Sequence, residues 1–184
     1  AGYTTFASAY SLDLDNLSEG LTAYYVKADG VNSDAVKLTK ATGKVKPGTG
    51  LVLKGNAGSY SIGTAEKTDD GIDGNLMVGC TTDTYVPQNA GYYVLANHEG
   101  EAQFQSLADH GLTIPAGKAY LDATSIVNGN ARLTIVIDDD TTGIMSILRE
   151  KGLDGDIYTL EGIRVENPKK GGLYIINGKK VVIK

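Results

Sequence analysis

Several residue types that build common functional sites are scarce or missing in this chain of 184 residues. Tryptophan is absent, and the chain has one cysteine, two histidines and four prolines. The lone Cys80 cannot form a disulfide within the chain and cannot bind zinc without other ligands. It ends the apolar run 76–80, so we expect a buried, unreactive thiol.

Long apolar runs and an excess of positive charge are also missing. No run approaches the roughly 20 residues of a membrane-spanning helix, so we expect no membrane span. The net charge of −5 gives no support to nucleic-acid binding. Residues 156–184 carry six basic and three acidic side chains, whereas residues 1–155 carry eleven and nineteen. A basic tail on an acidic body explains this asymmetry, and ordinary solvated strand faces explain it equally well.

Glycine and tyrosine are abundant, with 24 and 11 residues, and this favours an all-β chain. Each proline opens a turn that a glycine closes and a strand follows, because proline fixes φ and glycine tolerates positive φ. The expected strands after these turns are 51–54, 92–95, 118–121 and 173–176. Further strand candidates, several of them alternating between apolar and polar residues, are 21–26, 35–39, 59–62, 102–107 and 131–137.

The last thirteen residues give the strongest local signal. Two apolar runs flank Asn177-Gly178, a pair that suits the positive φ angles of a type I′ turn. A two-residue hairpin then places Tyr174 opposite Val181 and Leu173 opposite Val182. We expect an antiparallel β-sandwich or barrel-like domain over 1–140, a linker over 141–155 and a small β-hairpin tail over 156–184. The only candidate helix is 144–151, and strand and linker suit this segment equally well.

The tail resembles the C-terminal region of secreted and cell-surface proteins of the Bacteroides–Prevotella group. The resemblance rests on Tyr158–Val165, the Pro-Lys-Lys-Gly turn at 168–171 and the strand pair 172–184. It extends to shorter phrases in the first domain, at 20–24, 47–55, 74–79, 115–121 and 139–144. Glu161, Ile163 and the doubled Gly171-Gly172 depart from the usual pattern. The resemblance implies an extracellular or cell-surface location and offers no functional residues. Because the chain begins at Ala1 without Met, we expect a processed or truncated product.

No motif in the sequence specifies catalysis. Residues 111–119 come near a phosphate-binding loop, but they have one residue too many and no hydroxyl after Lys118. Residues 58–63 do not match the Gly-x-Ser-x-Gly motif of serine hydrolases. His98 and His110 lie in polar, loop-like segments, where exposed turn histidines are the ordinary interpretation. Cys80 with either histidine could form a thiol-protease pair but lacks a flanking signature.

Three further segments invite a binding role. Asp69–Asn75 offers oxygen ligands for calcium, although the EF-hand template fails there and a plain turn uses the same residues. Asp138–Asp140 is explained by a solvated strand end, and Asp140-Thr141-Thr142 resembles an O-glycan acceptor. Adjacent tyrosines in a strand point to opposite faces, so we expect one of each pair Tyr24-Tyr25 and Tyr92-Tyr93 in the core. The other of each pair could stack on sugars.

We therefore expect a non-catalytic, exported cell-surface module for adhesion, assembly or attachment, with no catalytic, cofactor-binding or metal site. Its partner would be another cell-surface protein or a glycan, and a longer parent chain could carry it. The alternatives are a carbohydrate-binding module that accompanies a glycan-degrading enzyme and a self-contained hydrolase with a histidine or paired acids in a cleft.

Overall fold

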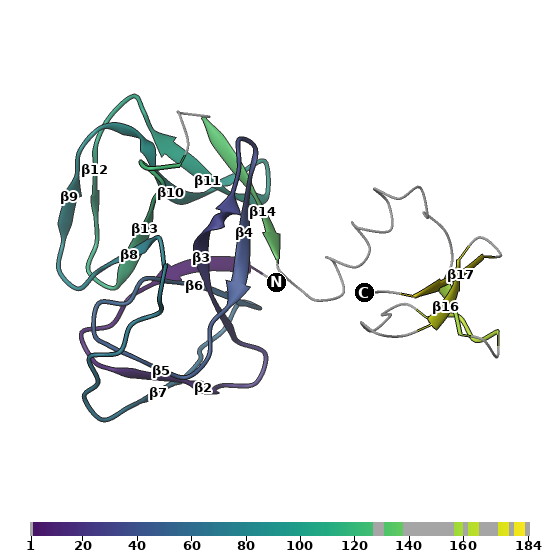
Figure 1. Cartoon of the computed structure of the whole chain (residues 1–184). Helices are drawn as coiled ribbons and strands as arrows, with labels where there is room; N and C mark the ends of the chain where they lie inside the picture. The colour runs from purple at the N-terminus through teal and green to yellow at the C-terminus, as the bar shows by residue number, and fades with distance from the viewer. Residues whose placement is uncertain are drawn as a thin grey trace. The chain divides into compact units, whose positions relative to one another are not determined.

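The expected all-β class is confirmed. In the computed structural model, the described residues 2–126, 131–137, 157–159, 162–165, 173–176 and 179–182 form strands β1 to β17 (Figure 1). The chain divides into two compact units, Ala1–Val136 and Ile137–Lys184. The candidate helix, the candidate linker and the aspartates 138–140 lie outside the described residues.

A nine-stranded sheet forms the frame of the first unit, in the order β1-β6-β3-β4-β14-β11-β10-β13-β8. Neighbouring strands whose register is known run antiparallel, as expected from the short connections. The strands are β1 (Gly2–Phe6), β3 (Thr22–Val31), β4 (Ala35–Lys40), β6 (Leu51–Gly55), β8 (Met77–Cys80), β10 (Asn89–His98), β11 (Glu101–Leu107), β13 (Lys118–Asp122) and β14 (Arg132–Ile137).

The sheet curls until it is nearly closed, which gives the barrel-like shape. β8 meets the start of β6 through an isolated bridge between Thr49 and Val78. Two glycines make this approach possible because a side chain would not fit. A Cβ at Gly50 would lie 2.6 Å from the Met77 carbonyl oxygen, and one at Gly79 would lie 2.7 Å from the Ala7 Cβ.

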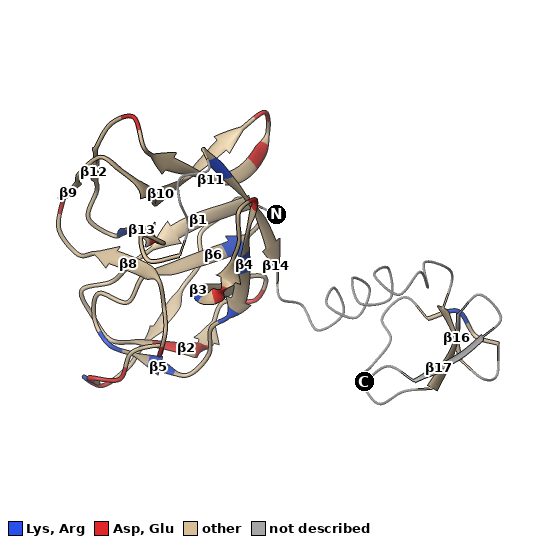
Figure 2. Cartoon of the chain, turned by 45° about the horizontal axis from the view of Figure 1, so that its top comes forward, with Lys and Arg blue, Asp and Glu red and all other residues tan. Residues whose placement is uncertain are grey.

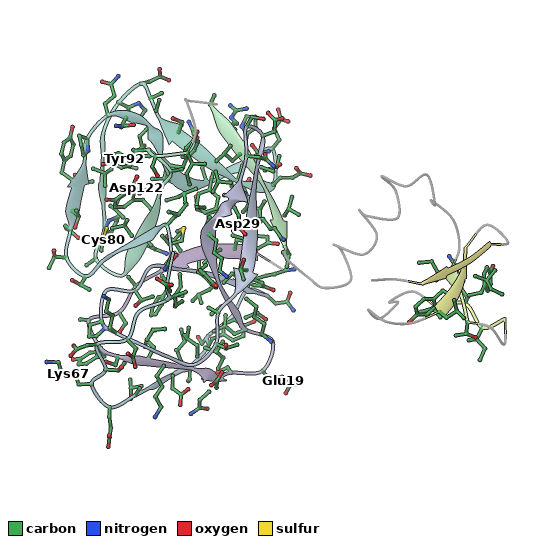
Figure 3. All side chains as sticks on the ribbon, viewed as in Figure 1. Glu19, Asp29, Lys67, Cys80, Tyr92 and Asp122 are labelled. Carbon is green, nitrogen blue, oxygen red and sulfur yellow. The ribbon has the colours of Figure 1, made fainter. Side chains whose placement is uncertain are left out.

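Two smaller sheets cover this frame (Figure 1). β2 (Leu12–Leu17) lies between β5 (Lys44–Val45) and β7 (Ile62–Thr64), and β9 (Thr84–Val86) pairs with β12 (Leu112–Ile114). Alternate leucines of β2, Leu12 and Leu14, pack with Tyr25, Leu51 and Leu53 in one core cluster. Cys80 packs in a second cluster, with Val86, Leu107 and Ile114. The side chains that fill the unit are shown in Figure 3.

The predicted proline turns are confirmed after Pro47 and Pro115, and the chain differs from the prediction after Pro87. Gly48 and Gly117 take φ angles of 77° and 83° after Pro47 and Pro115, as the turns require. After Pro87 the strand begins earlier than expected, at Asn89, so Gly91 lies inside β10. The reason for glycine there is space, since a Cβ would lie 2.5 Å from the Thr124 Cα.

The described residues of the second unit form a three-stranded sheet, one strand more than the expected hairpin. β15 (Ile157–Tyr158) pairs with β16 (Leu173–Ile176), which pairs with β17 (Lys179–Val182). The predicted register is confirmed, with Leu173 opposite Val182 and Tyr174 opposite Val181. The turn residues 177 and 178 lie outside the described residues.

Other strand predictions were partly wrong. The candidate 59–62 is mostly a loop, because β7 begins only at Ile62. The strands β1, β2, β5, β8, β9, β12 and β15 were not predicted. Several of them are too short to display a full alternating pattern, since β9 and β12 have three residues each and β8 has four.

Candidate functional site

The first unit contains a groove of about 900 Å³ beside strands β1 and β10. Residues 2–5 of β1 and 94–97 of β10 form its two long walls. The start of β11 and short segments of β12, β13 and β14 complete it. We call this hollow the β1–β10 groove.

The wall formed by β10 is a strand edge. On one side, β10 pairs with β11 along its whole second half, from Tyr93 to His98. On the other side, its pairing with β13 stops at Tyr93, opposite Leu121. The hairpin closes with Glu99 and Gly100 at φ angles of 55° and 89°, the geometry of a type I′ turn, in which the flanking pair His98–Glu101 is hydrogen-bonded.

The hydrogen-bonded pair His98–Glu101 fixes which way each peptide group of β10 points. Val94, Ala96 and His98 direct their backbone N–H and C=O groups toward β11, because hydrogen-bonded pairs alternate along an antiparallel ladder. Leu95 and Asn97 direct theirs toward the groove. The bond from the Ala123 N–H to the Gly91 carbonyl, 2.9 Å long, fits the same parity.

The wall formed by β1 is an edge as well. β1 is the last strand of the nine-stranded sheet and pairs only with β6. The Gly48 N–H donates to the Ser8 carbonyl at 2.8 Å, so even-numbered residues of this strand face β6 and odd-numbered residues face outward. Tyr3 and Thr5 therefore turn their peptide groups away from β6.

The groove ends where β1 meets β13, and these two strands lie side by side in Figure 2. The Ala7 N–H donates to the Gly117 carbonyl at 3.0 Å. The Ala119 N–H donates to the Thr5 hydroxyl at 3.2 Å, and Lys118 Nζ donates to the Thr4 hydroxyl at 2.8 Å. One backbone bond from Ala7 and two bonds to threonine hydroxyls of β1 thus take the place of a regular strand ladder at this point.

The lining of the groove combines apolar and polar groups. Ile114, Ala119 and Ile135 contribute apolar surface, while Lys118, Glu101 and Gln103 are polar. Of the described residues that line it, Glu101 is the single carboxylate, and none is a histidine or a cysteine. Charged residues are spread over the rest of the unit rather than gathered at one place (Figure 2).

A second hollow, of about 610 Å³, lies on the other side of β1. Its lining is mainly apolar and includes Leu21, Leu53 and Tyr60. Residues 2–4 of β1 border both hollows. The first half of β1 is therefore accessible from two directions.

The structure does not bring the candidate nucleophile and bases together. Cys80 is buried on β8, as expected, and is a free thiol. His110 is exposed in a turn. His98 differs from expectation because it is the last residue of β10 and is partly buried, with Nε2 2.9 Å from Arg132 Nη1 and 3.9 Å from a Glu99 carboxylate oxygen. In the described part of the chain, neither histidine contacts Cys80.

The tyrosine pairs do not form a sugar-stacking face. Tyr24 and Tyr25 are both buried, which corrects the expectation that one could be exposed. β3 is covered on both faces, so alternation places neither ring in solvent. Tyr93 is fully buried, and burial raises the pKa of its phenol. Tyr92 packs edge-on against Tyr120, with ring centroids 5.5 Å apart, and lies opposite Asp122 in the sheet (Figure 3).

The candidate calcium loop is engaged in structural bonds. The Asn75 side-chain oxygen accepts from the Met77 N–H at 2.9 Å, and its amide donates to the Gly50 carbonyl at 2.9 Å. The Asp70 carboxylate accepts from the Thr68 hydroxyl at 3.0 Å. Among the described residues, no three metal-ligating side chains come together. The acceptor tripeptide 140–142 lies outside these residues.

The segments that came near catalytic motifs have structural roles. Residues 112–114 form β12, and Lys118 begins β13, so no helix follows Gly117 as a phosphate loop would need. Residues 58–61 precede β7 as an irregular segment. Sequence reasoning missed β1, although Tyr3-Thr-Thr-Phe6 is a run of residues with high β-propensity that could have indicated it.

No family model, curated protein or solved structure matches this chain. Among the described residues, no helix is both long enough and apolar enough to cross a membrane.

Proposed function

We propose that this chain is a non-catalytic, exported module of the bacterial cell surface. It serves in adhesion, assembly or attachment, and the β1–β10 groove is its binding site. The observation that carries this proposal is a groove of about 900 Å³ whose two long walls are strand edges. The resemblance of the tail to surface proteins of the Bacteroides–Prevotella group supports the location.

The chemistry of the groove suits binding better than catalysis. General acid–base or nucleophilic catalysis needs titratable groups that face one another across a bound substrate. Glu101 and Lys118 are the charged residues among the described lining, and Lys118 Nζ is engaged by the Thr4 hydroxyl. Such a site holds a partner through shape, apolar contact and backbone hydrogen bonds.

A matched pair of variants tests the binding site. Ala96→Trp places a large ring in the groove, whereas Ala28→Trp adds the same ring at an exposed position of β3 outside the groove. We expect fluorescently labelled wild-type protein and Ala28→Trp to bind washed Bacteroides cells or a glycan array, and Ala96→Trp to lose that binding. Equal binding by all three proteins would contradict the assignment of the groove.

The non-catalytic part of the proposal has its own test. The triple variant His98→Gln, His110→Gln, Cys80→Ala removes the side chains whose ordinary pKa values lie nearest neutrality. We expect it to keep wild-type binding. Hydrolysis of peptide, ester or glycan substrates by the wild type, lost in a folded triple variant, would show that the chain is an enzyme.

A further inference from the structure

The interrupted pairing between β10 and β13 is the starting point. Tyr93 lies opposite Leu121, and the same register, continued by two residues, would place Leu95 opposite Ala119. The strands separate before that point. The Ala119 N–H turns to the Thr5 hydroxyl instead, so the edge of β10 at Leu95 and Asn97 has no paired strand among the described residues.

The opposite wall has the same character. β1 ends the sheet, and its outward peptide group at Tyr3 faces the groove, whereas the strand meets β13 at Thr5. Two strand edges thus face a common hollow. Unpaired edges attract further strands, and natural proteins usually cover, shorten or charge them. Here the two edges carry Tyr3, Thr4, Leu95 and Ala96 among the groove-lining residues. Pro115 and Lys118 also line the groove, but no lysine or proline lies within the edge residues 2–5 and 94–97.

We propose that the β1–β10 groove receives an extended segment of a separate protein, which pairs with β10 as an additional strand. This inference rests on the proposed function and names the class of its ligand. The segment makes backbone hydrogen bonds to Leu95 and Asn97 on one side and borders Tyr3 and Thr5 on the other. Addition of a strand to an exposed sheet edge is a general mode of peptide recognition.

The chemistry of the groove favours a peptide over a glycan. A peptide presents N–H and C=O groups at the strand repeat of about 3.3 Å per residue, which matches the spacing of a strand edge. Sugars are usually held by stacking on exposed aromatic rings. Tyr3 is the single aromatic side chain among the described lining of the groove, and Lys54 Nζ lies 5.7 Å from the centroid of its ring.

The lining also indicates the side chains of the bound segment. Successive side chains of an added strand point to opposite faces. Those that face Ile114, Ala119 and Ile135 should be small and apolar. Those on the other face should be polar, within reach of Glu101 and Lys118. We assign the bound segment to a separate protein, and the described strands of this chain each lie in one of its own sheets.

The test begins with a random heptapeptide phage library selected on the wild-type protein. Selected peptides are synthesised in two forms, one of them N-methylated at alternate residues, which removes backbone donors and keeps the side chains. We expect methylation of one alternate set to weaken binding at least tenfold, and methylation of the other set to weaken it less.

Two protein pairs provide the matching test from the other side. Leu95→Pro and Tyr3→Pro remove N–H groups that face the groove, and an edge position tolerates proline. Leu95→Val and Tyr3→Val shorten the same side chains and keep the N–H groups. We expect peptide affinity in each proline variant to be at least tenfold weaker than in the valine variant at the same position. Circular dichroism shows whether each variant folds. If a proline variant unfolds, the methylated peptides carry the test.

The possible outcomes separate the two proposals. Selected peptides that bind the proline variants as well as the valine variants, and that tolerate methylation at every position, would overturn the added-strand inference. Glycan-array binding abolished by Ala96→Trp, with no selected peptide, would also overturn it but leave the groove as a binding site. No groove-dependent binding to cells, glycans or peptides would refute the proposed function itself.

Discussion

The hydroxyl of Thr5 in β1 accepts a hydrogen bond of 3.2 Å from the backbone N–H of Ala119 in β13. Both residues are buried. A threonine side chain thus satisfies a peptide group that a neighbouring strand would otherwise bind, at the point where the β10–β13 ladder stops.

Replacing Thr5 with valine removes this acceptor and leaves the Ala119 N–H buried without it. An unsatisfied buried donor costs about 1–3 kcal/mol, so we expect the free energy of unfolding to fall by that amount. Thr4→Val is the control, because Thr4 is exposed and its change should stay within about 0.5 kcal/mol. Urea denaturation measures both variants, and equal stability of the two would show that the bond is unimportant.

Closure of the sheet depends on Gly79. Its hypothetical Cβ would collide with the Gly48 carbonyl oxygen and the Ala7 Cβ, groups on a backbone that cannot easily move. We expect Gly79→Ala to lower the free energy of unfolding by about 1–3 kcal/mol, as overpacking does. Gly58→Ala has no atom within 4 Å of the new methyl group and should be nearly neutral or slightly stabilising. Thermal unfolding that places both variants at the wild-type midpoint would contradict this account.

Alkaline pH should destabilise the first unit through Tyr120. Burial, followed by the nearby Tyr92, Asp122 and Cys80, raises the pKa of this phenol above its ordinary value. The folded state therefore holds the proton more tightly than the unfolded state. The resulting stabilisation is complete below about pH 10, the unfolded value, and is lost as the pH rises through the folded value.

Tyr120→Phe isolates that contribution. This variant keeps the ring against Tyr92 but has no phenol to titrate. We therefore expect its free energy of unfolding to fall less steeply than that of the wild type between about pH 9 and pH 11, a range around the ordinary phenol pKa. Tyr10→Phe alters a tyrosine that is 72% exposed and should follow the wild type. Urea midpoints measured across this range decide the question, and parallel curves for all three proteins would rule out the role of Tyr120.

Local signals in the sequence predicted those elements that local chemistry determines. The hairpin of β16 and β17 followed from two apolar runs around Asn-Gly, and its register was correct because the length of the turn fixes it. The burial of both Tyr24 and Tyr25 could not be predicted from alternation. It depends on how other strands pack on β3, and Tyr25 shares a core cluster with Leu12 and Leu14 of β2 and with Leu51 and Leu53 of β6.

The groove was beyond prediction for a similar reason. Its walls are defined by where pairing stops, at Tyr93 opposite Leu121, and by which strand lies at the end of the sheet. Neither property belongs to a short segment. Residues such as Leu95 and Tyr3 carry no chemical signature, because the groups that matter are their peptide N–H and C=O.

Amide hydrogen exchange of the free protein, resolved by residue with NMR, tests the central claim most directly. If β10 has one paired edge and one edge open to the groove, exchange should alternate along the strand. We expect Val94, Ala96 and His98 to be protected by β11 and Leu95 and Asn97 to exchange at least tenfold faster. Protection of Leu95 and Asn97 equal to that of Val94 and Ala96 would mean that this edge is already covered, and would contradict the account.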